Sequence, residues 1–145
     1  RSHNRAAIES HELSSFITLI EGSSIEPSVV EEVRSQIAPD ERVMVLLDSC
    51  HTKDHVLAEL SAYSGLVSPG SYIVAMDGIM EKVVGGPRTQ PDWSWNNPRQ
   101  AVLEFVRGNP QFTIEEPAFL FNESNISDRV TYWPSAFIRR GPHED

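Results

Sequence analysis

The sequence has few of the features that mark extracellular, membrane-bound or nucleic-acid-binding proteins. A single cysteine, Cys50, excludes a disulfide within the 145 residues and leaves oxygen and imidazole groups as the ligands of any metal. Basic residues are scarce, with 12 Lys and Arg against 21 Asp and Glu, so we expect no nucleic-acid partner. The sequence holds neither a run of about 18 apolar residues nor a signal-peptide pattern, so we expect a cytoplasmic protein without membrane contact.

What is present suits one globular α/β domain over residues 1–145, since 39% of the residues are hydrophobic. Apolar runs predict strands at Phe16–Ile20, Val43–Leu47 and Tyr72–Ala75. Helices are predicted before and between them. They span Arg5–His11, the segment from Ile25 to Ile37 with Pro27 in its first turn, and Thr52–Tyr63. Alternating strands and helices indicate a mostly parallel sheet that binds ligands beyond the carboxyl ends of its strands.

The second half of the sequence begins with a long loop over residues 78–96, rich in proline, glycine and tryptophan, which we expect to cover a site. Asn97 and Pro98 then predict the start of a helix that ends near Gly108. Two further strands should complete the sheet. The first is expected at Phe112–Glu115 or Phe119–Asn122, and the second, antiparallel, at Arg129–Trp133.

Two carboxylates follow neighbouring predicted strands. Asp48 ends one strand and Asp77 follows the next, so both should lie at one rim of the sheet, where they could share a magnesium ion. Each could instead cap the helix or turn that follows it. His51 lies three residues after Asp48 and could exchange a proton there, or could act as a cap. Cys50, between them, is interpreted as a packing residue.

A third element of this rim is Gly22–Ser23–Ser24, which follows the first predicted strand. A glycine lets the backbone approach a ligand, and the serines offer hydroxyls, although the same residues form an ordinary helix N-cap. His55 is expected to face solvent or to pack. The tryptophans at 93, 95 and 133 could line an apolar pocket or fill the core.

Several segments resemble one known family. They are HNRAAIESHELSSFITLIEGSSI, VLLDSCHTKDHVLAELSAYSGLVSPGSYIVAMD, NNPRQAVLEFV and the late AFIRR. Together they resemble the cephalosporin hydroxylase family, which is similar to rhamnosyl O-methyltransferases and belongs to the class I S-adenosylmethionine-dependent methyltransferases. The first two segments are the most specific, and the likeness is looser from Pro110 onward.

This resemblance implies a seven-stranded Rossmann-like sheet, an S-adenosylmethionine site and a magnesium site. By it, Gly22, Ser23 and Ser24 would lie beside the adenine, Asp48 and Asp77 would bind the metal, and His51 would be the general base. The reaction implied is methyl transfer to a hydroxyl of a sugar or another small molecule. The alternatives are a β-lactam hydroxylase and a non-catalytic binding or assembly module derived from a methyltransferase.

The sequence departs from the family in two places. Relatives commonly have an acidic pair where this chain has Met76 and Asp77, so we expect the metal site to have one ligand fewer or to be lost. No glycine-rich cofactor loop precedes Arg1, so we expect a partial domain that lacks the first two strands of the sheet. The strand predicted at Phe16–Ile20 would then lack its partner, and two copies could associate through the open sheet edge.

Overall fold

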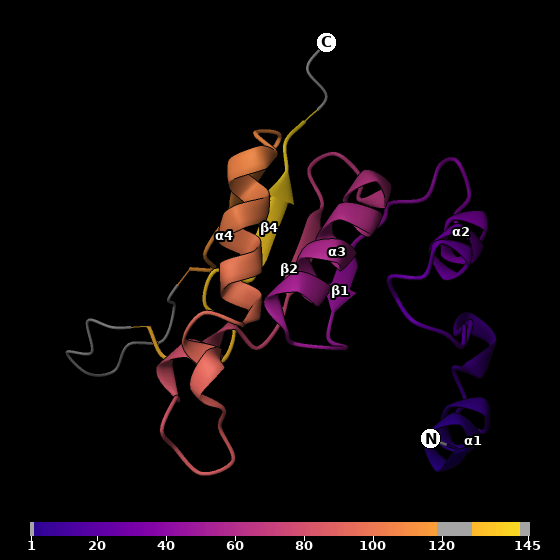
Figure 1. The fold of residues 1–145 in the computed structure, drawn as a ribbon. Helices are drawn as coiled ribbons and strands as arrows, with labels where there is room; N and C mark the ends of the chain where they lie inside the picture. Colours follow the sequence, from indigo (N-terminus) through magenta and orange to yellow (C-terminus); the bar gives the residue numbers. More distant parts are fainter. Residues whose placement is uncertain (1, 119–128, 143–145) are drawn as a thin grey trace.

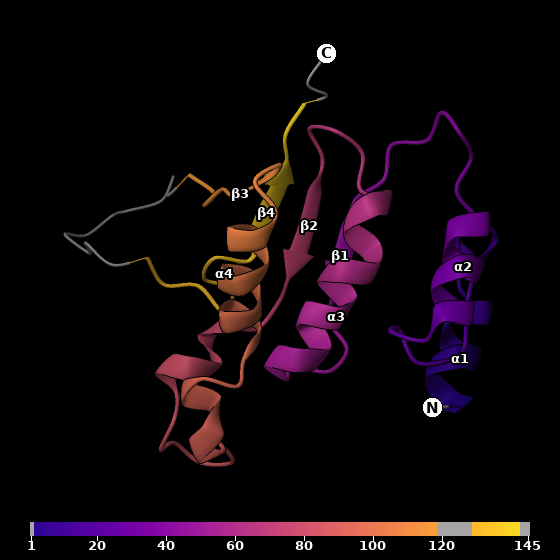
Figure 2. The ribbon, with the colours of Figure 1, turned by 45° about the horizontal axis from the view of Figure 1, so that its top comes forward.

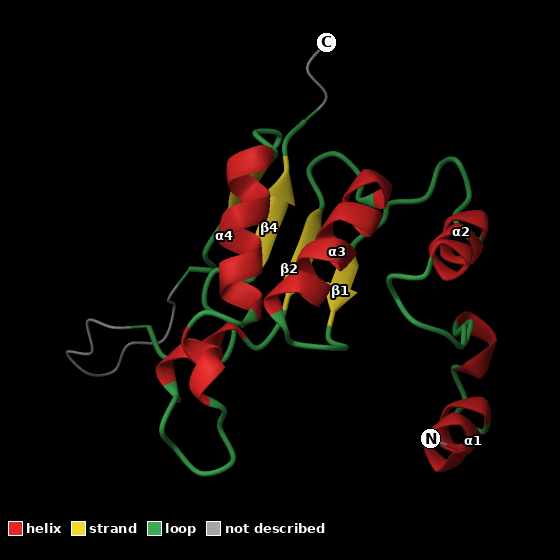
Figure 3. Cartoon of the chain, in the orientation of Figure 1, coloured by secondary structure: helices red, strands yellow, loops and turns green. Residues whose placement is uncertain are grey.

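The structure, a computed structural model, describes residues 2–118 and 129–142. Helices and strands alternate from residue 27 to residue 114 (Figures 1 and 3). The elements are α1 (Ser2–Glu9), α2 (Pro27–Ser35), β1 (Val45–Leu47), α3 (Lys53–Tyr63), β2 (Tyr72–Ala75), α4 (Pro98–Gly108), β3 (Phe112–Ile114) and β4 (Phe137–Arg140). Short 3-10 helices are η1 (Ser14–Phe16), η2 (Ser64–Leu66), η3 (Gly78–Lys82) and η4 (Pro91–Ser94). Within the described ranges, no helix is long and apolar enough to cross a membrane.

The four strands form one mixed open sheet in the order β1-β2-β4-β3. β1 and β2 are parallel, whereas β4 runs antiparallel to both β2 and β3. Three strands therefore point the same way and the last one is reversed, as expected. The fold is α/β and consistent with a Rossmann-like sheet. The last strand lies at Phe137–Arg140, so its predicted position at Arg129–Trp133 was wrong.

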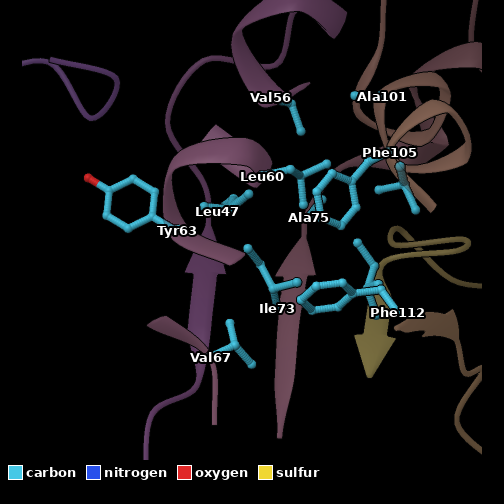
Figure 4. Close-up of a cluster of buried hydrophobic side chains, with 12 residues drawn as sticks. Leu47, Val56, Leu60, Tyr63, Val67, Ile73, Ala75, Ala101, Phe105 and Phe112 are labelled. Carbon is cyan, nitrogen blue, oxygen red and sulfur yellow. The ribbon is translucent and has the colours of Figure 1, made fainter. Parts of the chain in front are cut away.

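The core lies between this sheet and the helix pair α3 and α4, which pack side by side over one face of the strands (Figures 1 and 2). Figure 4 shows how side chains of both helices meet those of the strands. The buried residues of this cluster include Leu47, Val56, Leu60, Val67, Ile73, Ala75, Ala101, Val102, Phe105, Phe112 and Ile138. This packing fixes the strand ends that carry the candidate site.

The prediction of a buried strand at Phe16–Ile20 was wrong. Phe16 ends η1 and is 85% exposed, and residues 17–20 belong to no sheet in the described part of the chain. A β-branched and aromatic run becomes a strand only where a neighbouring strand accepts its hydrogen bonds, and here β1 is the edge of the sheet with Leu46 58% exposed. The alternative strand at Phe119–Asn122 lies outside the described residues.

The start of α4 is fixed by Asn97, as the sequence predicted. This side chain is fully buried, accepts a hydrogen bond from Gln100 N at 3.0 Å and donates one to Trp93 O at 2.8 Å. Pro98 occupies the first turn, where its missing N–H costs nothing.

We predict that Asn97→Ala lowers the free energy of unfolding by about 1–2 kcal/mol, because it removes the helix cap and takes the side-chain donor from the half-buried Trp93 carbonyl. Urea unfolding measures this loss. Gln36→Ala, at the exposed end of α2, is the control and should change stability by less than about 0.5 kcal/mol. An equally small effect at Asn97 would contradict the role of this cap.

Candidate active site at the carboxyl ends of two parallel strands

Asp48 and Asp77 lie at one rim of the sheet because the register of β1 and β2 brings them there. Leu47 pairs with Ala75, and Met76 N donates a hydrogen bond to Leu47 O at 3.1 Å just beyond the last pair. Asp48 follows Leu47 directly, and Asp77 follows Met76. The expectation that the two carboxylates approach one another is therefore met by the parallel pairing of β1 and β2.

Asp77 has an unusual backbone conformation for a residue other than glycine, with φ at 60° in the left-handed region. It precedes η3, but its side chain makes no capping hydrogen bond there. Gly78 follows in a tight place, since a Cβ on it would lie 2.8 Å from Pro134 O. Aspartate tolerates this conformation better than most residues, and such outliers cluster at functional sites. The capping interpretation of Asp77 is thus not supported by its contacts.

His51 joins the two carboxylates. Its Nε2 lies 3.3 Å from Asp48 Oδ1 and 3.6 Å from Asp77 Oδ2. The long loop also contacts the residues just after His51. At the start of α3, Lys53 N donates a hydrogen bond of 2.8 Å to Asn96 Oδ1 of that loop. One imidazole therefore stands between two acidic groups at the end of the sheet.

These three side chains fit a divalent cation. Each offers a ligand atom, and these atoms lie within 4.8 Å of one another. Ligands at about 2.1 Å from a magnesium ion can be at most about 4.2 Å apart, so a closure of under 1 Å would let all three atoms share one ion. Two carboxylates with waters suit magnesium or manganese. Met76, between Ala75 and Asp77, offers no hard ligand to this rim.

A cavity of about 510 Å³ opens beside His51 and Asp77. Its walls come from η3, η4 and the residues between them, so the long loop lines a hollow at the rim. The remaining lining residues are Thr52, Ile79, Met80, Val83, Gln90, Asp92, Trp93, Asn96 and Tyr132. Apolar walls with a few polar groups are typical of small-molecule sites. Of the three tryptophans, only Trp93 lines this cavity. The ring of Trp133 is tilted against the ring of Phe137, with 6.5 Å between the two ring centroids.

A second cavity, of about 300 Å³, lies along β1 on the side of Ser24. Asp48 and Ser49 are among its lining residues, together with Glu59 and Tyr63. Gly22 and Ser23 do not line it. Gly22 instead packs against α2, where an added Cβ would lie 2.5 Å from Val29 Cγ2. Of the predicted Gly22–Ser24 group, the structure therefore brings only Ser24 to this cavity.

A polar cluster at the second cavity was not predicted from the sequence. It is formed by Ser24, Ser49, His55 and Glu59, which we call the Glu59 cluster. His55 was expected to face solvent or to pack, but it is partly buried in hydrogen-bonding reach of both serines. A signal existed, because Glu59 falls in the row of apolar residues that α3 turns toward the core.

Tyr63 borders the same cluster, and its hydroxyl points out of the hydrophobic core (Figure 4). This hydroxyl donates a hydrogen bond to Ser24 O at 2.7 Å. Burial, with the nearby Glu59 carboxylate, raises the pKa of Tyr63 above its ordinary value, so the neutral form that donates this bond is favoured. Cys50, in contrast, is exposed and not the packing residue that we expected.

Comparison with known proteins agrees with the resemblance seen in the sequence. A rhamnosyl O-methyltransferase of Mycobacterium tuberculosis (strain H37Rv) and one of Mycobacterium bovis (strain BCG Pasteur) are each 34% identical to this chain over 62 residues. The match covers 42% of this chain and 25% of each relative, so the chain spans about a quarter of the length of these proteins. No solved structure matches the chain significantly. The model of the family described as rhamnosyl O-methyltransferase/CmcI matches residues 1–141, and the chain therefore belongs to this methyltransferase family.

Proposed function

We propose that this chain forms the acceptor and metal side of an S-adenosylmethionine-dependent O-methyltransferase that acts on a hydroxyl of a sugar or another small molecule. The observation that carries the proposal is the meeting of Asp48, His51 and Asp77 at the ends of two parallel strands, beside a cavity of small-molecule size. Family membership supports the methyl-transfer chemistry. A cytoplasmic location, the lack of a nucleic-acid partner and the association of two copies through an open sheet edge stay predictions.

In this proposal each residue of the rim has a distinct role. A magnesium ion held by Asp48 and Asp77 would lower the pKa of an acceptor hydroxyl. His51 Nε2 would accept the proton of that hydroxyl, and S-adenosylmethionine, when bound, would supply the methyl group to its oxygen and leave as the neutral thioether. The long loop with Trp93 would hold the acceptor in the larger cavity, and Ser24, which lines the smaller cavity together with Asp48, would face the cofactor.

The β-lactam hydroxylase alternative has less support from the site. Iron centres for hydroxylation commonly use two histidines and one carboxylate, whereas this cluster contains one imidazole and two carboxylates. No described contact favours it over methyl transfer.

Calorimetric titration with S-adenosylmethionine tests the proposal. We expect the 145-residue chain by itself to bind more weakly than about 100 μM, or about -5.5 kcal/mol, because the sequence contains no glycine-rich loop of the dinucleotide-binding type. The complete protein encoded by its gene should bind more tightly and transfer the labelled methyl group to sugar hydroxyls. Tighter binding by a monomer of this chain would mean that other residues form the site. A complete protein that binds no S-adenosylmethionine would favour the non-catalytic alternative.

A further inference from the structure

The Glu59 cluster places a carboxylate where apolar residues would be expected. Glu59 is 2% exposed and lies in the buried row of α3 with Val56 and Leu60. Burying a carboxylate costs several kcal/mol unless its partners compensate. Its Oε2 has no hydrogen-bond partner among the described residues. Core stability alone therefore does not explain a glutamate at this position.

The other oxygen of Glu59 joins two segments that are distant in sequence. Ser24 Oγ donates a hydrogen bond to Oε1 at 2.5 Å, and Ser49 Oγ donates one to the same atom at 2.7 Å. Ser24 belongs to the loop before α2, whereas Ser49 directly follows Asp48. Hydrogen bonds to a charged acceptor are shorter and stronger than neutral ones, so Glu59 ties this loop to the turn that carries the rim.

His55 completes the cluster but does not form a catalytic relay. Its Nε2 lies 3.2 Å from Ser24 Oγ, 3.3 Å from Ser49 Oγ and 3.5 Å from Glu59 Oε1. A relay needs the carboxylate on one ring nitrogen and the hydroxyl on the other. Here Nε2 alone faces all three oxygens, so His55 helps to hold the two serines and Glu59 together and does not relay a proton.

We propose that Glu59 is a positioning residue that couples the Ser24 loop to Asp48, so that one buried carboxylate sets both the proposed cofactor side and the proposed metal side of the site. This inference rests on the proposed function for its consequence in catalysis. The coupling itself is a property of the hydrogen bonds. Residues that hydrogen-bond directly to metal ligands typically contribute 10- to 100-fold in metal affinity. Glu59 acts one step further away, through Ser49, so we expect an effect at the lower end of this range.

Glu59→Leu separates positioning from stability. The variant removes the acceptor of the Ser24 and Ser49 hydroxyls, but Ser24 is half-buried and Ser49 is exposed, so water can replace it. We therefore expect this variant to unfold at about the same urea concentration as the wild type. We nevertheless expect its affinity for Mn²⁺ to fall at least about tenfold. Glu59→Gln keeps one acceptor oxygen and should recover part of that affinity. Glu32→Leu, at an exposed position of α2, is the control and should leave Mn²⁺ binding unchanged.

Backbone order parameters from ¹⁵N relaxation provide a readout that does not depend on the metal. In Glu59→Leu they should fall from about 0.85 toward 0.6 at both Ser23–Ser24 and Ser49–His51. If both segments loosen but even the wild type binds no Mn²⁺, the metal proposal fails and the coupling stands. Order parameters unchanged in either segment, or Mn²⁺ affinity within twofold of a wild type that binds, would overturn the inference.

Discussion

Replacement of His51 by alanine should lower the rate of methyl transfer by about 10²- to 10⁴-fold, the usual loss when a general base is removed. The physical reason is the position of Nε2 between Asp48 and Asp77, at 3.3 and 3.6 Å, where an acceptor hydroxyl bound at the rim would meet it. Affinity for S-adenosylmethionine should stay within about threefold of the wild type, since the base acts on the acceptor and not on the sulfonium. Initial rates with the complete protein, followed by calorimetry, measure both quantities.

His3→Ala is the matched control for this variant, because His3 is exposed in α1 and far from the rim in sequence. It should keep full activity. Full activity of His51→Ala across neutral pH would show that His51 only orders the turn before α3.

The second large effect concerns the carboxylates. Asp48→Asn and Asp77→Asn should each weaken Mn²⁺ binding by at least about 10- to 100-fold, because loss of a direct ligand should cost at least as much as loss of an outer partner. Asparagine keeps the size of the side chain and removes its charge. The local geometry should survive, since Asp77 makes no capping hydrogen bond that the change would break.

Asp54→Asn tests whether this effect is specific to the rim, because Asp54 is an exposed carboxylate in the first turn of α3. It should leave Mn²⁺ affinity within about twofold of the wild type. Titration calorimetry of the 145-residue chain is sufficient, as all three candidate ligands lie within it. Equal Mn²⁺ affinities for all three variants would show that the ion binds elsewhere.

The rim could be predicted from sequence because strand ends are local features. Val43–Leu47 and Tyr72–Ala75 are short apolar runs, and an aspartate follows each within two residues, so parallel pairing was enough to bring Asp48 and Asp77 together. The start of α4 could likewise be predicted, because Asn97 and Pro98 are residues that favour a helix N-terminus at their positions. In each case a few adjacent residues determine the outcome.

The errors fall where the structure depends on distant partners. The run Phe16–Ile20 has strand composition, but composition does not supply the neighbour that a strand requires. The last strand was misplaced because Val130, Tyr132 and Trp133 look as strand-like as Phe137–Arg140, and only pairing with β2 and β3 selects the latter. The Glu59 cluster could not be predicted from the sequence, because only the fold brings together Ser24 and Glu59, which are 35 residues apart in the chain.

Anomalous diffraction from crystals of this chain grown with Mn²⁺ would locate the ion that Asp48 and Asp77 are proposed to bind. We expect one strong peak at the carboxyl ends of β1 and β2, about 2.1–2.3 Å from carboxylate oxygens of both Asp48 and Asp77. Such a peak would also show whether His51 Nε2 binds the ion or stays free to accept a proton. Saturating Mn²⁺ with no peak between these two carboxylates, or a peak bound only by other residues, would contradict the proposed metal site.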